Sequence, residues 1–85
     1  MLQFNYTIKD DLGLHARPAG LLVKAADKFP CKVSITKGEK TADAKKLFGV
    51  MGLCVRCGDT VTMTCDGEQE QEALAEIQNL IEKNL

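Results

Sequence analysis

The amino-acid sequence predicts an α+β fold in which helices cover one face of a largely antiparallel sheet, in the order β-α-β-β-α-β-α. Segments in which apolar residues alternate, as on a half-buried strand, are interleaved with segments in which they recur at helical spacing. The chain has 85 residues and 45% of them are hydrophobic, enough for one core and no more. We therefore expect a single domain over residues 1–85.

The first strand and the first helix have clear patterns. Apolar and polar residues alternate from Leu2 to Ile8, which is typical of a half-buried strand, and a turn-rich stretch at 10–13 ends it. From Ala16 to Phe29 the apolar residues recur at helical spacing. Pro18 falls in the first turn of this helix, where its missing N–H does no harm, and Pro30 ends the helix.

The middle of the chain predicts a hairpin followed by a short helix. Residues 33–36 alternate as a strand, 37–39 resemble a hairpin turn, and 40–43 supply a short third strand. The stretch 45–53 indicates a short helix that two glycines weaken.

The last third of the chain predicts one strand and one helix. A turn at Gly58-Asp59 leads into a strand at 61–65, and a second turn follows at Asp66-Gly67. Residues 73–85 have the most regular amphipathic pattern of the chain, which predicts the final helix.

Charge and hydropathy exclude several classes of function. Eleven basic against twelve acidic side chains give a net charge of −1, and nucleic-acid-coating or membrane-surface proteins need a basic excess. No apolar run approaches the roughly 20 residues of a membrane span, and the N-terminal residues do not resemble a signal peptide. We therefore expect a cytoplasmic protein with reduced cysteines, without nucleic-acid binding or membrane insertion.

The charge is distributed unevenly. Residues 1–65 carry a net charge of +4 and residues 66–85 a net charge of −5. A basic body could steer an acidic partner to one face. For the acidic segment we favour the simpler interpretation, a solvated helix face.

The only histidine, His15, lies between the turn residue Gly13 and the start of the first predicted helix, at or beside its N-cap. The first N–H groups of a helix lack partners and the helix dipole is positive there, so this position favours an anion such as phosphate. The same potential favours the neutral imidazole, whose nitrogen lone pair is a nucleophile. The pattern indicates a site where histidine accepts a phosphoryl group. From the residues alone, a surface histidine that caps a helix is an equal alternative.

The segment Gly13-Leu14-His15-Ala16-Arg17-Pro18-Ala19 resembles the active-site motif of the HPr family, the histidine-containing phosphocarriers of the phosphoenolpyruvate:sugar phosphotransferase system. The resemblance extends over the whole chain and includes the segment 45–51. It implies an open-faced β-sandwich with a four-stranded antiparallel sheet and three helices on one face. This expectation agrees with the pattern of predicted elements.

The resemblance also implies a mechanism. His15 would accept a phosphoryl group from enzyme I on the ring nitrogen nearer the backbone and donate it to sugar-specific IIA domains. Arg17, whose guanidinium fork suits phosphate oxygens, and the backbone at Ala16 would hold the phosphoryl group. The protein would then be a carrier and a covalent substrate, with no enzymatic turnover and no cofactor, and a monomer.

The family's partner-binding surface joins the first helix to the short second one. On helical spacing, one side of the first helix is distinct from its apolar stripe, so we expect a shallow apolar patch with a basic rim. The patch comprises Gly20, Leu21, Leu47, Phe48 and Met51, and the rim comprises Arg17, Lys24, Lys28, Lys45 and Lys46.

Two positions depart from the family pattern. Lys46 stands where many members carry a regulatory serine, so we expect no phosphoserine switch here. Leu12 stands where polar residues are usual beside the active-site loop, with an uncertain effect on the phosphoryl site.

Two other functions are alternatives. One is a regulatory docking module of the same fold, although relatives of that kind lack the active-site histidine. The other is a metal or thiol carrier built on Cys54 and Cys57, which have the C-x-x-C spacing. Cys31 and Cys65 lie far along the chain, so we expect no metal site, and we expect Cys54 and Cys57 to be buried or half-buried thiols.

Overall fold

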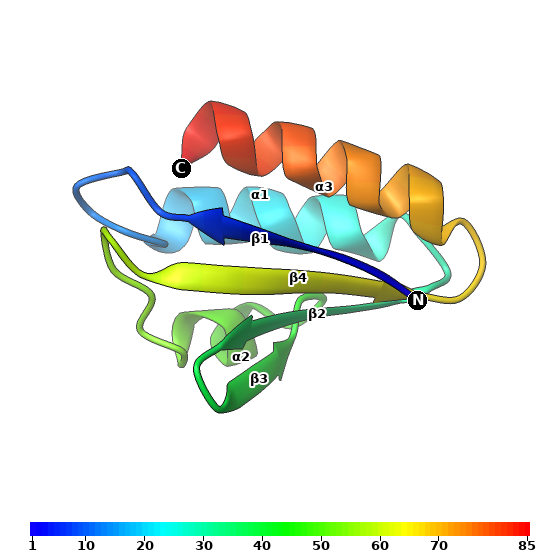
Figure 1. Ribbon diagram of the computed structural model, residues 1–85, viewed down its shortest axis with the longest axis horizontal. Coiled ribbons are helices and arrows are strands. Elements are labelled where there is room, and N and C mark those ends of the chain that lie inside the picture. The colour runs from blue at the N-terminus through cyan, green and yellow to red at the C-terminus, as the bar shows by residue number, and fades with distance from the viewer.

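The computed structural model describes residues 1–85 and has the predicted order of elements. Four strands form one antiparallel sheet in the order β1-β4-β2-β3, and three helices cover one of its faces (Figure 1). The elements are β1 (Leu2–Thr7), α1 (Ala16–Asp27), β2 (Lys32–Lys37), β3 (Lys40–Asp43), α2 (Leu47–Met51), β4 (Thr60–Asp66) and α3 (Glu70–Asn84). The predicted α+β open-faced sandwich is confirmed.

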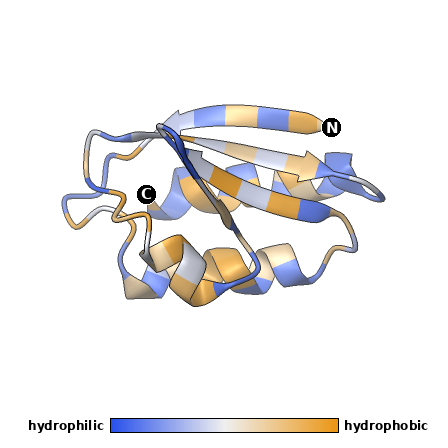
Figure 2. Ribbon diagram, turned by 90° about the horizontal axis from the view of Figure 1, so that it is seen from below, coloured by the Kyte–Doolittle hydropathy of each residue, from blue (hydrophilic) through white to orange (hydrophobic).

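The sheet is built around β4, which pairs with β1 on one side and with β2 on the other. Met63 is the partner of Phe4 in β1 and of Ile35 in β2. Along β4 the residues are alternately buried and partly exposed, as the period of two requires. Figure 2 shows this alternation as changing colours along the strands, which form the layer above the helices. The buried face of the sheet forms one side of the hydrophobic core.

Helices α1 and α3 pack against each other and against the sheet. Both present small or branched apolar residues to a continuous core of 19 buried residues. The predicted stripe on α1 is confirmed, with Ala19, Leu22 and Ala26 fully buried. Helix α3 begins at Glu70, earlier than the apolar pattern indicates, because its first turn is polar. The Glu70 carboxylate accepts the N–H of Gly67 at 3.1 Å and so stabilises this start.

Helix α2 is short, and of its five residues only Val50 is buried. It contacts α1 and β3 and leaves most of its apolar surface exposed. None of the three helices has the length and apolar composition that crossing a bilayer requires.

The four cysteines separate into two pairs. Cys31 and Cys65 are buried, and burial, reinforced by the neighbouring Cys31 thiol, raises the pKa of Cys65 to about 11. The expectation that Cys54 and Cys57 are buried or half-buried is wrong, because both are exposed. In this loop Val55 is buried in the core, so its neighbours Cys54 and Arg56 face solvent, and Cys57 lies beyond them on the same exposed loop.

The raised pKa of Cys65 predicts a loss of stability at alkaline pH. Above its ordinary pKa near 9, the thiol ionises in the unfolded chain but stays protonated in the folded one, up to about 11. The free energy of unfolding should therefore fall across this range, by up to about 2 kcal/mol from this group. Urea unfolding between pH 7 and 11 measures the fall.

Other groups titrate in the same range, so variants are needed to assign the fall to Cys65. A Cys65→Ala variant should show a shallower decline than a Cys57→Ala variant, which removes an exposed thiol. Parallel profiles for the two variants would contradict the assignment.

Candidate functional site

The site begins in the loop between β1 and α1, which turns at Gly13. This residue has a φ of +67°, a conformation that L side chains rarely adopt. A Cβ atom at Gly13 would lie 2.5 Å from the backbone oxygen of Val55 and 2.7 Å from Cα of Arg56. Only glycine lets the loop approach the loop before β4 this closely.

Backbone hydrogen bonds join these two loops. The N–H of Leu14 donates to the oxygen of Val55 at 3.0 Å, the N–H of Ile8 to the oxygen of Asp59 at 2.9 Å, and the N–H of Gly58 to the oxygen of Ile8 at 2.8 Å. The end of β1 is also fixed by Leu85, whose backbone oxygen accepts the N–H groups of Lys9 at 2.6 Å and Asp10 at 2.9 Å. The segment leading to His15 is therefore held from two sides.

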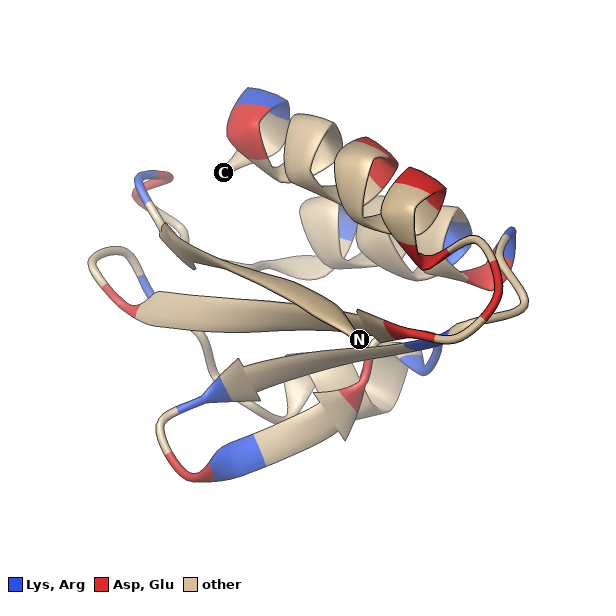
Figure 3. Ribbon diagram, turned by 45° about the vertical axis from the view of Figure 1, so that its right-hand side comes forward, with Lys and Arg blue, Asp and Glu red and all other residues tan.

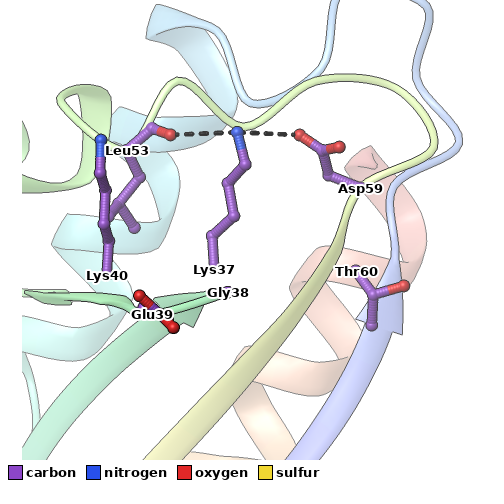
Figure 4. A pocket seen from close by; sticks show the side chains of 7 residues that line it. All are labelled: Lys37, Gly38, Glu39, Lys40, Leu53, Asp59 and Thr60. Atoms are coloured by element: carbon purple, nitrogen blue, oxygen red, sulfur yellow. Dashed lines mark hydrogen bonds and ion pairs between the residues drawn. The ribbon is translucent and has the colours of Figure 1, made fainter.

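The loop before β4 is itself anchored by Asp59. Its carboxylate accepts the N–H of Arg56 at 2.9 Å and pairs with the ammonium of Lys37 at 3.1 Å. The hydrogen bond from Arg56, with the one from Lys37, lowers the pKa of Asp59. Figure 4 shows Lys37 between Asp59 and the backbone oxygen of Leu53, in a groove that contains neither His15 nor Arg17. The groove is therefore lined by the hairpin between β2 and β3 and by the contacts that anchor the loop before β4.

His15 is the N-cap of α1, as predicted. Its backbone is extended, with a φ of −90° and a ψ of −176°, and its oxygen accepts the N–H of Ala19 at 3.0 Å. Its side chain does not cap the helix. The N–H groups of Ala16 and Arg17 make no hydrogen bond within the chain, and Pro18 has no N–H. Two free donors therefore lie at the positive end of the helix next to the imidazole.

The imidazole of His15 is partly exposed, at 32%, and its Nε2 lies 3.8 Å from Oδ2 of Asp10. The other carboxylate oxygen of Asp10 accepts the N–H of Leu12 at 2.8 Å. The sequence pattern predicts Asp10 only as part of a turn and does not predict its approach to the imidazole. The signal that was present is the Asx-turn, in which an aspartate binds the N–H two residues further on.

Arg17 and Leu12 are both exposed. Arg17 makes no ion pair or hydrogen bond through its guanidinium, so its donors are available to an anion. The side chain of Leu12 is 74% exposed and adds apolar surface beside the loop.

The predicted apolar patch lies on the surface. Phe48 is 90% exposed, and Leu21, Leu47 and Met51 are exposed to 36–40%. Gly20 is half-buried on α1, with open space where its Cβ would be. Because α1 and α2 contact each other, these residues belong to adjoining helices.

The predicted basic rim divides into free and engaged side chains. Lys28 pairs with Glu76 of α3 at 2.9 Å, and the ammonium of Lys45 donates to the backbone oxygen of Phe29 at 2.7 Å. Lys24 and Lys46 are exposed and make no ion pair. Figure 3 shows acidic residues along α3 and basic ones on the neighbouring α1.

The acidic C-terminal segment is only partly a solvated face. Besides Glu76, Glu70 is engaged, since its carboxylate pairs with the N-terminal ammonium of Met1 at 2.8 Å. No group of three or more His, Cys, Asp or Glu side chains gathers in a way that could hold a metal ion.

The fold and the histidine at the start of α1 are those expected for a member of the HPr family of phosphocarriers. A family model described as "PTS HPr component phosphorylation site" matches residues 2–83. The chain belongs to the HPr family of the phosphotransferase system.

Known relatives are similar over nearly their full length. The phosphocarrier protein HPr of Mycoplasma genitalium is 38% identical, with 99% of this chain and 97% of that protein covered. The HPr-like protein Crh of Halalkalibacterium halodurans is 37% identical, with 98% and 99% covered. A structure of HPr from Thermoanaerobacter tengcongensis has a TM-score of 0.93 at 38% identity, with 98% and 93% covered, and a structure of the HPr dimer from that organism has a TM-score of 0.78.

The close approach at Gly13 predicts a large difference between two glycine variants. Gly13→Ala should lower the free energy of unfolding by about 3 kcal/mol or more, because a Cβ there meets the backbone of the opposite loop as well as an unfavourable φ. Gly38→Ala has a similar φ of +60° but open space around it, and should cost about 1 kcal/mol. Chemical denaturation compares the two, and equal losses would contradict the importance of the loop contact.

Proposed function

We propose that the chain accepts a phosphoryl group on His15 from phosphorylated enzyme I and donates it to sugar-specific IIA domains. The position of His15 is the observation that carries this proposal, because a partly exposed imidazole stands at a helix N-terminus beside two unpaired N–H groups. The phosphotransferase family to which the chain belongs supports the same assignment. In this proposal the protein is a cytoplasmic, monomeric carrier that the partner enzymes use as a covalent substrate.

The role of each residue follows from the charge that the phosphoryl group brings. The N–H groups of Ala16 and Arg17 would bind its oxygens at the positive end of α1. The Arg17 guanidinium, free of ion pairs, would supply a further charged donor. Ala16 and Arg17 are both exposed to solvent, which suits a phosphoryl group that must be passed on to a partner.

Partners would dock on the apolar patch of Gly20, Leu21, Leu47, Phe48 and Met51. An exposed aromatic residue on a short helix is unfavourable in water and is typical of a binding surface. Lys24, Lys46 and Arg17, which have no ion pairs within the chain, would attract acidic partner surfaces. Lys28 and Lys45 can contribute only after exchanging the contacts they already make.

A serine-based switch would be absent at the start of α2. Lys46, the N-cap of this helix, has no hydroxyl to phosphorylate and carries a positive charge instead of the negative one of a phosphoserine. We therefore infer that any regulation of this chain does not use that position.

The phosphoryl relay predicts a defined mass change. Incubated with phosphoenolpyruvate, magnesium and enzyme I, the chain should gain one acid-labile phosphoryl group, and His15→Ala should gain none. Arg17→Ala keeps the acceptor and should still gain the group, but about tenfold more slowly. Intact-protein mass spectrometry over time measures all three.

The phosphorylation experiment and a metal-binding titration separate the two alternatives. No phosphoryl addition with an active, matched enzyme I would favour a docking module of the HPr fold. Stoichiometric metal binding that a Cys54→Ser, Cys57→Ser variant abolishes would favour the metal carrier.

The docking surface predicts that Phe48→Ala separates binding from folding. Because this side chain is 90% exposed, the thermal midpoint should stay nearly unchanged while the affinity for enzyme I falls by about tenfold. Calorimetric titration measures the affinity, and Gln3→Ala, an exposed change on β1, is the control. Equal affinities of the two variants would place the docking surface elsewhere.

A further inference from the structure

Asp10 is tied to the backbone around His15 more firmly than a residue of an ordinary surface turn. Its N–H donates to the oxygen of Leu85, its backbone oxygen accepts the N–H of Gly13 at 2.9 Å, and its Oδ1 accepts the N–H of Leu12 at 2.8 Å. These contacts fix the carboxylate, leaving Oδ2 toward Nε2 of His15 at 3.8 Å. Asp11, its exposed neighbour, makes no such contact.

A carboxylate that faces one ring nitrogen determines which nitrogen carries the proton of a neutral imidazole. The negative oxygen attracts an N–H and repels a lone pair, so the proton is favoured on Nε2. The lone pair is then on Nδ1. The separation of 3.8 Å is too long for a hydrogen bond, so the carboxylate acts on the ring through its charge.

We propose that Asp10 is a positioning residue that holds the proton of His15 on Nε2 and so presents Nδ1 as the phosphoryl acceptor. This inference rests on the proposed phosphocarrier function. In the transfer, the Nδ1 lone pair forms the bond to phosphorus, and the bond from phosphorus to the donor breaks with its electron pair going to the donor. The proton stays on Nε2 beside Asp10. In the return step the ring leaves as neutral imidazole, because that proton is already in place.

The variant Asp10→Asn tests this role sharply. If the amide oxygen keeps the N–H of Leu12, the amide NH₂ group faces Nε2 and donates to it. The proton is then favoured on Nδ1, which blocks the acceptor. Asp11→Asn removes the same charge from the adjacent position and is the matched control.

Nitrogen NMR of histidine-labelled protein reads the tautomer directly, and the single histidine makes the assignment unambiguous. At a pH where the ring is neutral, the wild type and Asp11→Asn should carry the proton on Nε2. Asp10→Asn should raise the Nδ1–H population at least about threefold. An unchanged population in Asp10→Asn would overturn the proposal.

A kinetic measurement complements the tautomer. Asp10→Asn should lower the maximal rate of phosphoryl acceptance from enzyme I by the same factor as it lowers the Nε2–H population, with little change in KM, because docking is untouched. Asp10→Ser, which keeps an oxygen for the N–H of Leu12, replaces it if the asparagine variant does not fold, and should also lose the tautomer preference.

The two hypotheses fail in different ways. A wild type that never gains a phosphoryl group sinks the carrier function, whatever the tautomer. A wild type that is phosphorylated, with an Asp10→Asn variant of normal tautomer and rate, sinks the role of Asp10 alone.

Discussion

The contact between the loop of Gly13 and Leu14 and the loop before β4 is the constraint on which the rest of the site depends. Of the backbone hydrogen bonds that join the two loops, the one from Leu14 to Val55 lies next to Gly13, where the approach leaves no room for a side chain. Helix α1 starts immediately beyond this contact, with His15 as its N-cap. The contact of Gly13 with the loop before β4 therefore sets the direction of the free N–H groups of Ala16 and Arg17.

The proposed phosphoryl acceptor lies at the end of a loop, whereas the proposed docking surface lies on the helices α1 and α2. His15 belongs to a loop braced on both sides, whereas the apolar patch includes a five-residue helix that buries only Val50. The hydrogen-bonded loop keeps His15 in a fixed position, and the short helix with the exposed Phe48 provides apolar surface for a partner. Within the basic rim, Lys28 pairs with Glu76 and so joins α1 to α3, whereas Lys24 and Lys46 make no ion pair.

Much of this structure could be predicted because its signals are local. The alternation on the strands, the stripe on α1 and the position of His15 beside Pro18 each involve residues within a turn or two of one another. Other contacts join segments that only the folded chain brings together. Lys45 donates a hydrogen bond to the backbone oxygen of Phe29, and the thiol of Cys31 lies beside that of Cys65. The exposure of Cys54 follows from the inward direction of Val55, which no periodicity in that short loop reveals. For Asp10 the sequence predicts the turn but not the approach to the imidazole, because that distance depends on how tightly the loop closes in the folded chain.

The backbone oxygen of Leu85 accepts N–H groups from Lys9 and Asp10, so a residue about 70 positions further along the chain than His15 holds the segment that leads to the histidine. During synthesis the motif around His15 leaves the ribosome before Leu85, whose backbone oxygen binds the segment that leads to it. A partly translated chain that lacks residue 85 therefore exposes His15 before the backbone around it is fixed.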